Sequence, residues 1–266
     1  MPETAPGLPG APGIAARGVP GETAVPAARE RILGRLRAAR TDAGLPPAAA
    51  APSATAEAAP RPAAAEFFAA KAWPPAERLA RLRRCMEAVK AEFVEATAAT
   101  WPAAVRDLLR AAGARSLMAG AGSPLAAPLA AAGAGGDLPH LVLYDRPVEE
   151  LKASLFSTVD AGITCCLGGI AETGGLVLCP SPAEPRLLSL VPPIHLVLLD
   201  PARLWDTLWQ AARELGWARS IPRNALVISG PSKTADIEQT LAYGVHGPKR
   251  LVVVLVPGGP TPGPAQ

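Results

Sequence analysis

The chain has 266 residues, a formal net charge of +3 and four cysteines. Its 26 basic and 23 acidic residues nearly balance, which argues against the strongly basic surface of a nucleic-acid-binding protein. Residues 1–25 lack the basic start and apolar centre of a secretory signal, and no apolar run approaches the ~20 residues of a membrane-spanning helix. These observations predict a cytoplasmic protein with reduced thiols.

The sequence predicts one folded domain preceded by a helix, with low-complexity segments around them. The first part of the chain is too rich in Pro, Ala and Gly to form much core. Ile32, Leu33 and Leu36 form a short apolar stripe among arginines, which predicts an amphipathic helix packing one edge on the domain. The expected parts are a disordered tail at 1–28, this helix at 29–44, an Ala/Pro linker at 45–65, an α/β domain at 66–257 and a second disordered tail at 258–266.

Two helices and a strand are predicted to open the domain. Apolar residues recur at three- and four-residue steps between Pro75 and Ala98, as in a helix that buries one stripe. Trp101-Pro102 is expected to end that helix, and a second helix is predicted at Val105–Ala112. A strand at Ser116–Ala119 follows.

The turn after this strand is the first candidate binding site. Gly120, Gly122 and Ser123 follow the carboxyl end of a strand, which is where open α/β sheets bind ligands. Their backbone N–H groups could approach a phosphate or a carboxylate. The alternative is that these residues only form a tight turn.

The middle of the domain alternates strands, turns and helices. Predicted elements are strands at His140–Tyr144, Gly162–Cys165, Leu176–Cys179 and Ile194–Leu199, and helices at Val148–Phe156 and Pro201–Leu215. Glu172 and Thr173 lie in a turn between apolar runs, where Glu172 is either hydrogen-bonded to neighbouring N–H groups or free to act as acid, base or nucleophile. For His195, a ring nitrogen bonded to a backbone carbonyl is favoured over catalysis. Trp205, Leu208 and Trp209 are expected to pack in the core from one side of their helix.

Residues 224–256 are predicted to form strand, turn, short helix, turn and strand. Ala225–Ile228 and Leu251–Val256 are apolar runs typical of buried parallel strands. The predicted helix begins near Ser232, and its start is a candidate anion site made by Ser229, Gly230, Ser232, Lys233, Thr234 and Asp236. Asp236 and Glu238 would repel an anion, so helix capping is an equal alternative. The spacing does not fit a nucleotide P-loop.

His246 completes the candidates, as a proton donor to a ligand or as a residue that fixes its turn. We hypothesise that these polar turns, together with those at Gly120 and Thr173, converge along one edge of the sheet. Glu172 and His246 are then the candidate catalytic residues.

Metal and redox sites find no support in the sequence. Cys85, Cys165, Cys166 and Cys179 include no C-x-x-C pair, and the neighbours Cys165 and Cys166 point to opposite faces of a strand. Histidines and carboxylates lack metal-ligand spacing, and no G-x-G-x-x-G follows a strand. We therefore predict no metal, no nicotinamide or flavin cofactor and no iron–sulfur cluster on this chain, with most cysteines buried.

Several motifs resemble the LUD-domain family of lactate-utilisation proteins, in particular its C type. They are Ile228-Ser-Gly-Pro-Ser-Lys-Thr-Ala-Asp-Ile-Glu238, Gly244-Val-His-Gly-Pro248, Ile170-Ala-Glu-Thr-Gly174 and Leu190-Val-Pro192. The resemblance implies a mostly parallel α/β fold like that of the ribose-phosphate isomerase, glucosamine-phosphate deaminase and CoA-transferase group. It also implies a role in oxidising L-lactate to pyruvate beside iron–sulfur partner proteins. The alternatives are a stand-alone enzyme acting on a sugar phosphate or acyl-CoA, and a structural adaptor.

Overall fold

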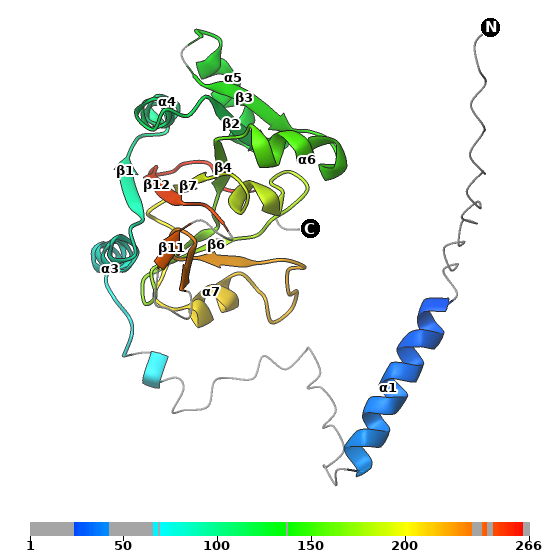
Figure 1. The fold of residues 1–266 in the computed structure, drawn as a ribbon. Helices are drawn as coiled ribbons and strands as arrows, with labels where there is room; N and C mark the ends of the chain where they lie inside the picture. The colour runs from blue at the N-terminus through cyan, green and yellow to red at the C-terminus, as the bar shows by residue number, and fades with distance from the viewer. Residues whose placement is uncertain are drawn as a thin grey trace, which may run out of the picture. The chain divides into compact units, whose positions relative to one another are not determined.

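The computed structural model describes residues 24–42, 66–68, 70–136, 138–235, 241–243 and 247–262 (Figure 1). The chain divides into two units, residues 1–56 and 57–266. In the first unit, α1 (Ala24–Asp42) overlaps the amphipathic helix predicted at 29–44 and begins at Ala24. Residues 1–23, the whole of the predicted linker at 45–65 and residues 263–266 lie outside the described residues.

The second unit is built on a parallel six-stranded sheet. Across the sheet, the strands are β1 (Glu92–Glu95), β12 (Arg250–Leu255), β7 (Ile194–Leu199), β4 (Ala161–Cys165), β2 (Ser116–Gly120) and β3 (His140–Tyr144). Strands of this kind bury both faces and therefore read as continuous apolar runs. The predicted mostly parallel α/β fold is confirmed.

Different elements pack against the two faces of this sheet. On one face, Leu196 and Val252 pack in a cluster with Trp101 of α4 (Trp101–Ala111) and Leu129 of α5 (Ala126–Gly133). On the other face, Val197 and Val253 pack with α3 (Pro75–Ala88) and with a second sheet. Helix α6 (Val148–Ser157) lies beside β3, against a small cluster around Met118. The sheet is therefore flanked by helices on one face and by α3 and a second sheet on the other.

The second sheet has four strands and mixed directions. In order they are β8 (Leu204–Trp205), β5 (Gly168–Ile170), β6 (Gly175–Leu178) and β9 (Leu226–Ile228). The prediction that Ala225–Ile228 joins a buried parallel sheet is wrong, because β9 pairs antiparallel with β6 and Val227 is 49% exposed. β9 is an edge strand of this sheet, and its middle residue, Val227, is exposed while Leu226 and Ile228 are half-buried.

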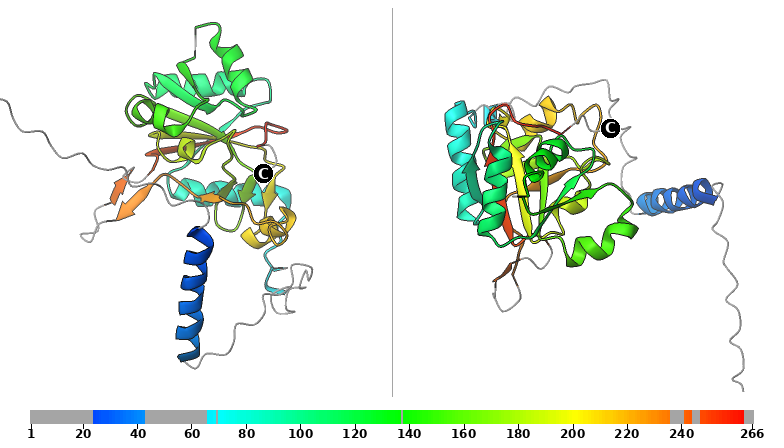
Figure 2. Two further views of the ribbon diagram at one scale, coloured as in Figure 1. Left: turned by 90° about the vertical axis from the view of Figure 1, so that its right-hand side faces the viewer. Right: turned by 90° about the horizontal axis from the view of Figure 1, so that it is seen from above.

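The predicted helix after Ser232 is also wrong. Lys233–Ala235 forms β10, which pairs antiparallel with β11 (Leu241–Tyr243), and this hairpin stands away from the body of the unit (Figure 2). A helix this short gains few hydrogen bonds for its costly first turn, whereas the hairpin pairs the same backbone groups. Asp236, Glu238, Gly244 and His246 lie outside the described residues.

Two other predicted helices are too long. Helix α3 ends at Ala88, because Lys90 adopts a left-handed φ of 71°, and Phe93 then lies in β1. Trp101-Pro102 begins α4 instead of ending a helix, since proline is accepted in a first helical turn. Of the predicted Pro201–Leu215 helix only α7 (Leu208–Glu214) is helical, and Trp205 lies in β8.

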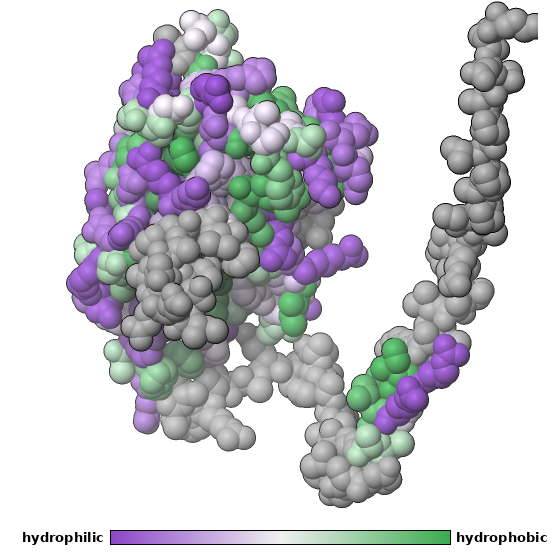
Figure 3. All heavy atoms as spheres, in the orientation of Figure 1, coloured by the Kyte–Doolittle hydropathy of each residue, from purple (hydrophilic) through white to green (hydrophobic). Residues whose placement is uncertain are grey.

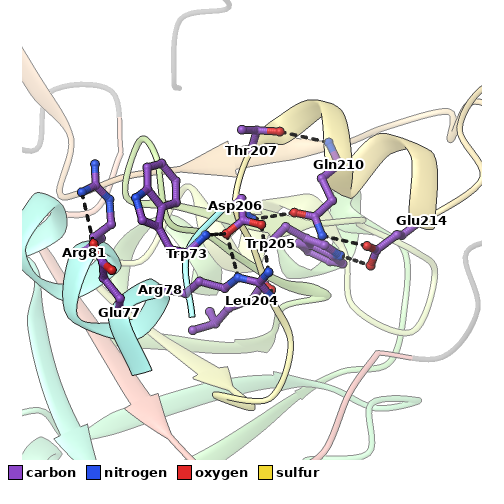
Figure 4. A network of polar contacts seen from close by, with 10 residues as sticks. All are labelled: Trp73, Glu77, Arg78, Arg81, Leu204, Trp205, Asp206, Thr207, Gln210 and Glu214. Carbon is purple, nitrogen blue, oxygen red and sulfur yellow. Dashed lines mark hydrogen bonds and ion pairs between the residues drawn. The ribbon is translucent and has the colours of Figure 1, made fainter. Parts of the chain in front are cut away.

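The small polar network in Figure 4 joins α3 to β8 and α7. The Asp206 carboxylate accepts hydrogen bonds from Arg78 Nε at 2.7 Å, Arg78 Nη2 at 2.8 Å and the Trp73 backbone N–H at 3.0 Å. Trp205 Nε1 donates to Glu214 at 2.8 Å. These bonds satisfy a nearly buried carboxylate, and Asp206 lines neither of the two cavities described below.

The surface offers no single large apolar face in the view of Figure 3, where hydrophobic residues are scattered among hydrophilic ones. No helix in the described part of the chain combines the length and the apolar character needed to cross a bilayer.

Candidate functional site

The order of the central strands reverses between β2 and β4. After β2 the chain continues to β3 on one side, and after β4 it continues through the second sheet to β7 on the other side. In open α/β sheets the crevice at such a reversal, outside the carboxyl ends of the strands, is the preferred ligand site. Here those ends are Gly120 and Cys165.

The loop that follows β6 returns over this edge and buries Glu184 there. Glu184 is 6% exposed. Its carboxylate accepts hydrogen bonds from Ser123 Oγ at 2.5 Å and from the Cys165 backbone N–H at 3.1 Å. Burial raises the pKa of Glu184, and the bonds from Ser123 and Cys165 offset part of that shift. The Glu184 carboxyl therefore binds its proton more tightly than an exposed glutamate does.

The glycines of the β2 turn let this loop approach closely. A Cβ on Gly120 would lie 1.8 Å from the backbone oxygen of Ala183, and one on Gly122 would lie 3.1 Å from Ala183 Cβ. Gly120 is thus needed for packing. Ser123 is 6% exposed, and its hydroxyl bonds to Glu184 and to the Leu125 N–H, so it is occupied within the protein.

A cavity of about 800 Å3 opens beside Glu184, and we call it the carboxyl-end cavity. Its polar lining includes Gly122, Ser181, Glu184, Arg186, Arg223 and Asn224. Both arginines are exposed, and within the described residues neither forms an ion pair. Guanidinium groups bind carboxylates and phosphates through paired hydrogen bonds. The two arginines favour an anionic ligand in this cavity.

The raised pKa of Glu184 predicts a pH-dependent stability. The native state holds this proton more tightly than the unfolded chain, whose glutamates titrate near about 4.3. The contribution of Glu184 to the free energy of unfolding is therefore complete below that pH and declines as pH rises through the native pKa. Glu184→Gln has no such proton, so the variant should gain stability relative to wild type as pH rises.

Urea unfolding between about pH 4 and pH 8 measures this difference. Glu150→Gln, an exposed glutamate on α6, is the matched control and should give a difference that changes little with pH. A constant offset between Glu184→Gln and wild type across the range would contradict the burial argument.

A second group of predicted residues lines another cavity at the opposite end of the central strands. Ser229, Gly230 and Ser232 border a space of about 230 Å3 together with His195 and Leu251, and we call it the amino-end cavity. His195 and Leu251 are register partners near the amino ends of β7 and β12. Gly122 and Ser232 thus lie at opposite ends of the sheet.

The remaining candidates line neither cavity. The Glu172 carboxylate accepts a hydrogen bond from Lys71 Nζ, and the Glu172 backbone N–H donates to the backbone carbonyl oxygen of Asp206. Thr173 is exposed in the turn between β5 and β6, and neither residue lines a cavity. Lys233 and Thr234 lie in β10. The hypothesis that these turns converge along one edge is therefore wrong for the described residues, because Gly122, Thr173 and Ser232 share no cavity.

The sequence analysis did not predict the charged residues that line the carboxyl-end cavity. Glu184 and Arg186 flank Pro185 in a loop that follows the second sheet, and Arg223 lies just before β9. Charged residues between prolines after a buried strand were the available signal. For His195, the predicted backbone carbonyl partner is wrong, because Nε2 lies 2.9 Å from the Thr164 hydroxyl.

The cysteines are placed as predicted. Cys165, Cys166 and Cys179 are buried, and Cys165 and Cys166 belong to the clusters on opposite faces of the sheet. Burial raises the pKa of the Cys166 thiol to about 12 and also raises that of Cys179. Among the residues that the structure describes, no group of three His, Cys, Asp or Glu could hold a metal ion.

Together, the fold and the cavity at its strand reversal define an α/β protein with a candidate site for a small anion. Residues 79–256 match the model of the LUD domain, and the chain belongs to the LUD domain family.

Several relatives are similar to this chain in sequence, and a solved structure shares its fold. An uncharacterized protein of Neisseria meningitidis serogroup B is 37% identical over 184 residues, which are 68% of this chain and 77% of that protein. Lactate utilization protein C of an Exiguobacterium species is 34% identical over 42% of this chain, and the match spans about half (51%) of that relative. A crystal structure of a DUF162 family protein from Deinococcus radiodurans has the same fold, with a TM-score of 0.52 and 24% identity over 70% of this chain and 99% of the other.

Proposed function

We propose that this chain is a component of a system that oxidises L-lactate to pyruvate and that acts with iron–sulfur partner proteins. Relatives named Lactate utilization protein C, from Exiguobacterium, Shouchella clausii and Halalkalibacterium halodurans, support a role in lactate utilisation. The LUD domain shared across residues 79–256 supports it as well.

The observation that carries the proposal is the pair of arginines at the carboxyl-end cavity. Arg186 and Arg223 line it without an acidic partner among the described residues, and Asn224 adds an amide group. A guanidinium holds a carboxylate by two parallel hydrogen bonds, and an amide can bond to a neighbouring hydroxyl or carbonyl oxygen. These side chains would therefore hold lactate or pyruvate by its carboxylate and its C2 oxygen.

The electrons of this reaction need an acceptor outside the cavity. Conversion of L-lactate to pyruvate releases two electrons and two protons, and iron–sulfur clusters are held by Cys ligands, or by Cys and His ligands together. Cys165 and Cys166 lie in clusters on opposite faces of the sheet, and the described residues include no group of three His, Cys, Asp or Glu that could hold a metal ion. We therefore assign the electron-accepting iron–sulfur clusters to the partner proteins.

A sugar phosphate is the second candidate ligand, and the size of the cavity favours it. About 800 Å3 is within the usual range for drug-sized ligands and exceeds the need of a three-carbon acid. Two guanidinium groups also suit a phosphate. In that case the chain would act as a stand-alone enzyme or sensor instead of a lactate component.

Titration calorimetry and co-purification test the proposal. The full chain is expected to bind L-lactate or pyruvate saturably and ribose 5-phosphate more weakly; the reverse order would favour the second candidate. Co-expressed with the iron–sulfur proteins of a lactate-utilisation system, the chain should co-purify with them, and the iron should remain with the partners after separation. Stoichiometric iron on this chain would contradict the assignment of the clusters.

A further inference from the structure

The amino-end cavity holds a buried side chain with an unused polar atom. His195 is fully buried, and its Nδ1 has no hydrogen-bond partner within the described part of the chain. The imidazole lines the cavity together with residues of both sheets. Native proteins leave few buried polar atoms unpaired, and each such atom calls for a partner.

The hydrogen bonds around the ring assign its proton. Burial lowers the pKa of His195 to about 3, so the ring is neutral and carries one proton. The Thr164 hydroxyl, 2% exposed and 2.9 Å from Nε2, has no other bond in the described structure. If this hydroxyl donates to Nε2, the ring proton is on Nδ1 and one atom is unpaired. With the proton on Nε2 instead, both the Nδ1 lone pair and the hydroxyl hydrogen of Thr164 would lack a partner. We therefore assign the proton to Nδ1.

The rest of the lining limits what can accept that proton. The described lining residues include no charged side chain: they offer the hydroxyls of Ser189, Ser229 and Ser232 beside apolar groups such as Leu190 and Leu251. A carboxylate would lose its hydration without gaining a counter-charge, whereas an uncharged carbonyl oxygen would not meet that cost. The volume of about 230 Å3 is below the usual range for drug-sized ligands and suits a molecule of a few heavy atoms.

We propose that the amino-end cavity binds a small uncharged carbonyl compound, such as a short-chain amide, ketone or aldehyde, whose oxygen accepts the Nδ1 proton of His195. The serine hydroxyls would bond to the remaining polar atoms, and the alkyl part would lie against Leu190 and Leu251. This site shares no lining residue with the carboxyl-end cavity, so the inference does not depend on the role in lactate oxidation.

Nitrogen NMR of the imidazole rings in the full-length protein tests the proposal with propionamide and acetone. Propionamide is expected to shift the Nδ1 signal of His195 saturably, while propionate, its charged analogue, should not. In His195→Leu, binding followed at the backbone amides of Gly230 and Leu251 should weaken roughly tenfold or more, because a neutral hydrogen bond is lost.

Two further variants keep the test decisive. Thr164→Val removes the donor to Nε2, so it should change the nitrogen shifts of His195 and weaken propionamide several-fold, even if His195→Leu fails to fold. Arg186→Ala with Arg223→Ala should leave propionamide binding unchanged. No saturable shift with either carbonyl compound, or equal affinity in the His195 variant, would mean that the cavity holds only water.

Discussion

Replacing Arg186 and Arg223 together with alanine is expected to abolish most ligand affinity at the carboxyl-end cavity. Each guanidinium supplies a charge-assisted hydrogen bond, but both side chains are exposed, so each loss should be at the low end of the range for such bonds. A combined loss of about hundredfold in the dissociation constant for L-lactate or pyruvate follows. Titration calorimetry on the full chain measures it.

A matched double variant controls for the change in net charge. Arg115 and Arg219 are exposed and line neither cavity, so Arg115→Ala with Arg219→Ala should change the affinity by less than about threefold. If both double variants lost the same affinity, Arg186 and Arg223 would act only through the net charge of the protein and not through direct contact with the ligand. Unchanged affinity in Arg186→Ala with Arg223→Ala would remove the cavity from the proposed function.

Gly120→Ala is expected to lower the stability more than the addition of a methyl group at any other glycine of this edge. The added Cβ would lie 1.8 Å from the Ala183 carbonyl oxygen, and backbone cannot yield as the end of a flexible side chain can. The loop must move away, which breaks the hydrogen bonds that Glu184 accepts from Ser123 and Cys165. We expect a loss of about 3 kcal/mol or more in the free energy of unfolding. Urea unfolding of the purified variant gives the number.

Gly135→Ala provides the control, since a Cβ there meets nothing within 4 Å and the residue lacks a left-handed φ. Its stability should stay within about 1 kcal/mol of wild type. A Gly120→Ala protein as stable as wild type would show that the loop over β2 is held only loosely, and would weaken the case for a preformed cavity.

The central sheet was predictable because its longest strands are continuous apolar runs in the sequence. Ile194–Leu199 and Leu251–Leu255 are long apolar runs buried on both faces, so sequence and structure agree almost residue for residue. The short strands were not predictable in this way. β9 and β10 have three residues each, and their partners β6 and β11 decide their conformation.

The site was predictable only in its location along β2. Gly122 lines the carboxyl-end cavity because a turn after a parallel strand must lie at that edge of the sheet. Glu184 reaches the same edge from a loop 61 residues beyond Ser123, and no local pattern reports such a contact. Glu172 was undecided for the same reason, since its cation, Lys71, lies 101 residues earlier.

The strand β9 lies between the two cavities along the chain. Asn224, two positions before it, borders the carboxyl-end cavity, and Ser229, directly after it, borders the amino-end cavity. Four residues, 225–228, separate Asn224 from Ser229, and the last three of them pair with β6. A slip of β9 by one residue would therefore reshape both binding spaces at the same time, so the pairing of this edge strand sets the geometry of each.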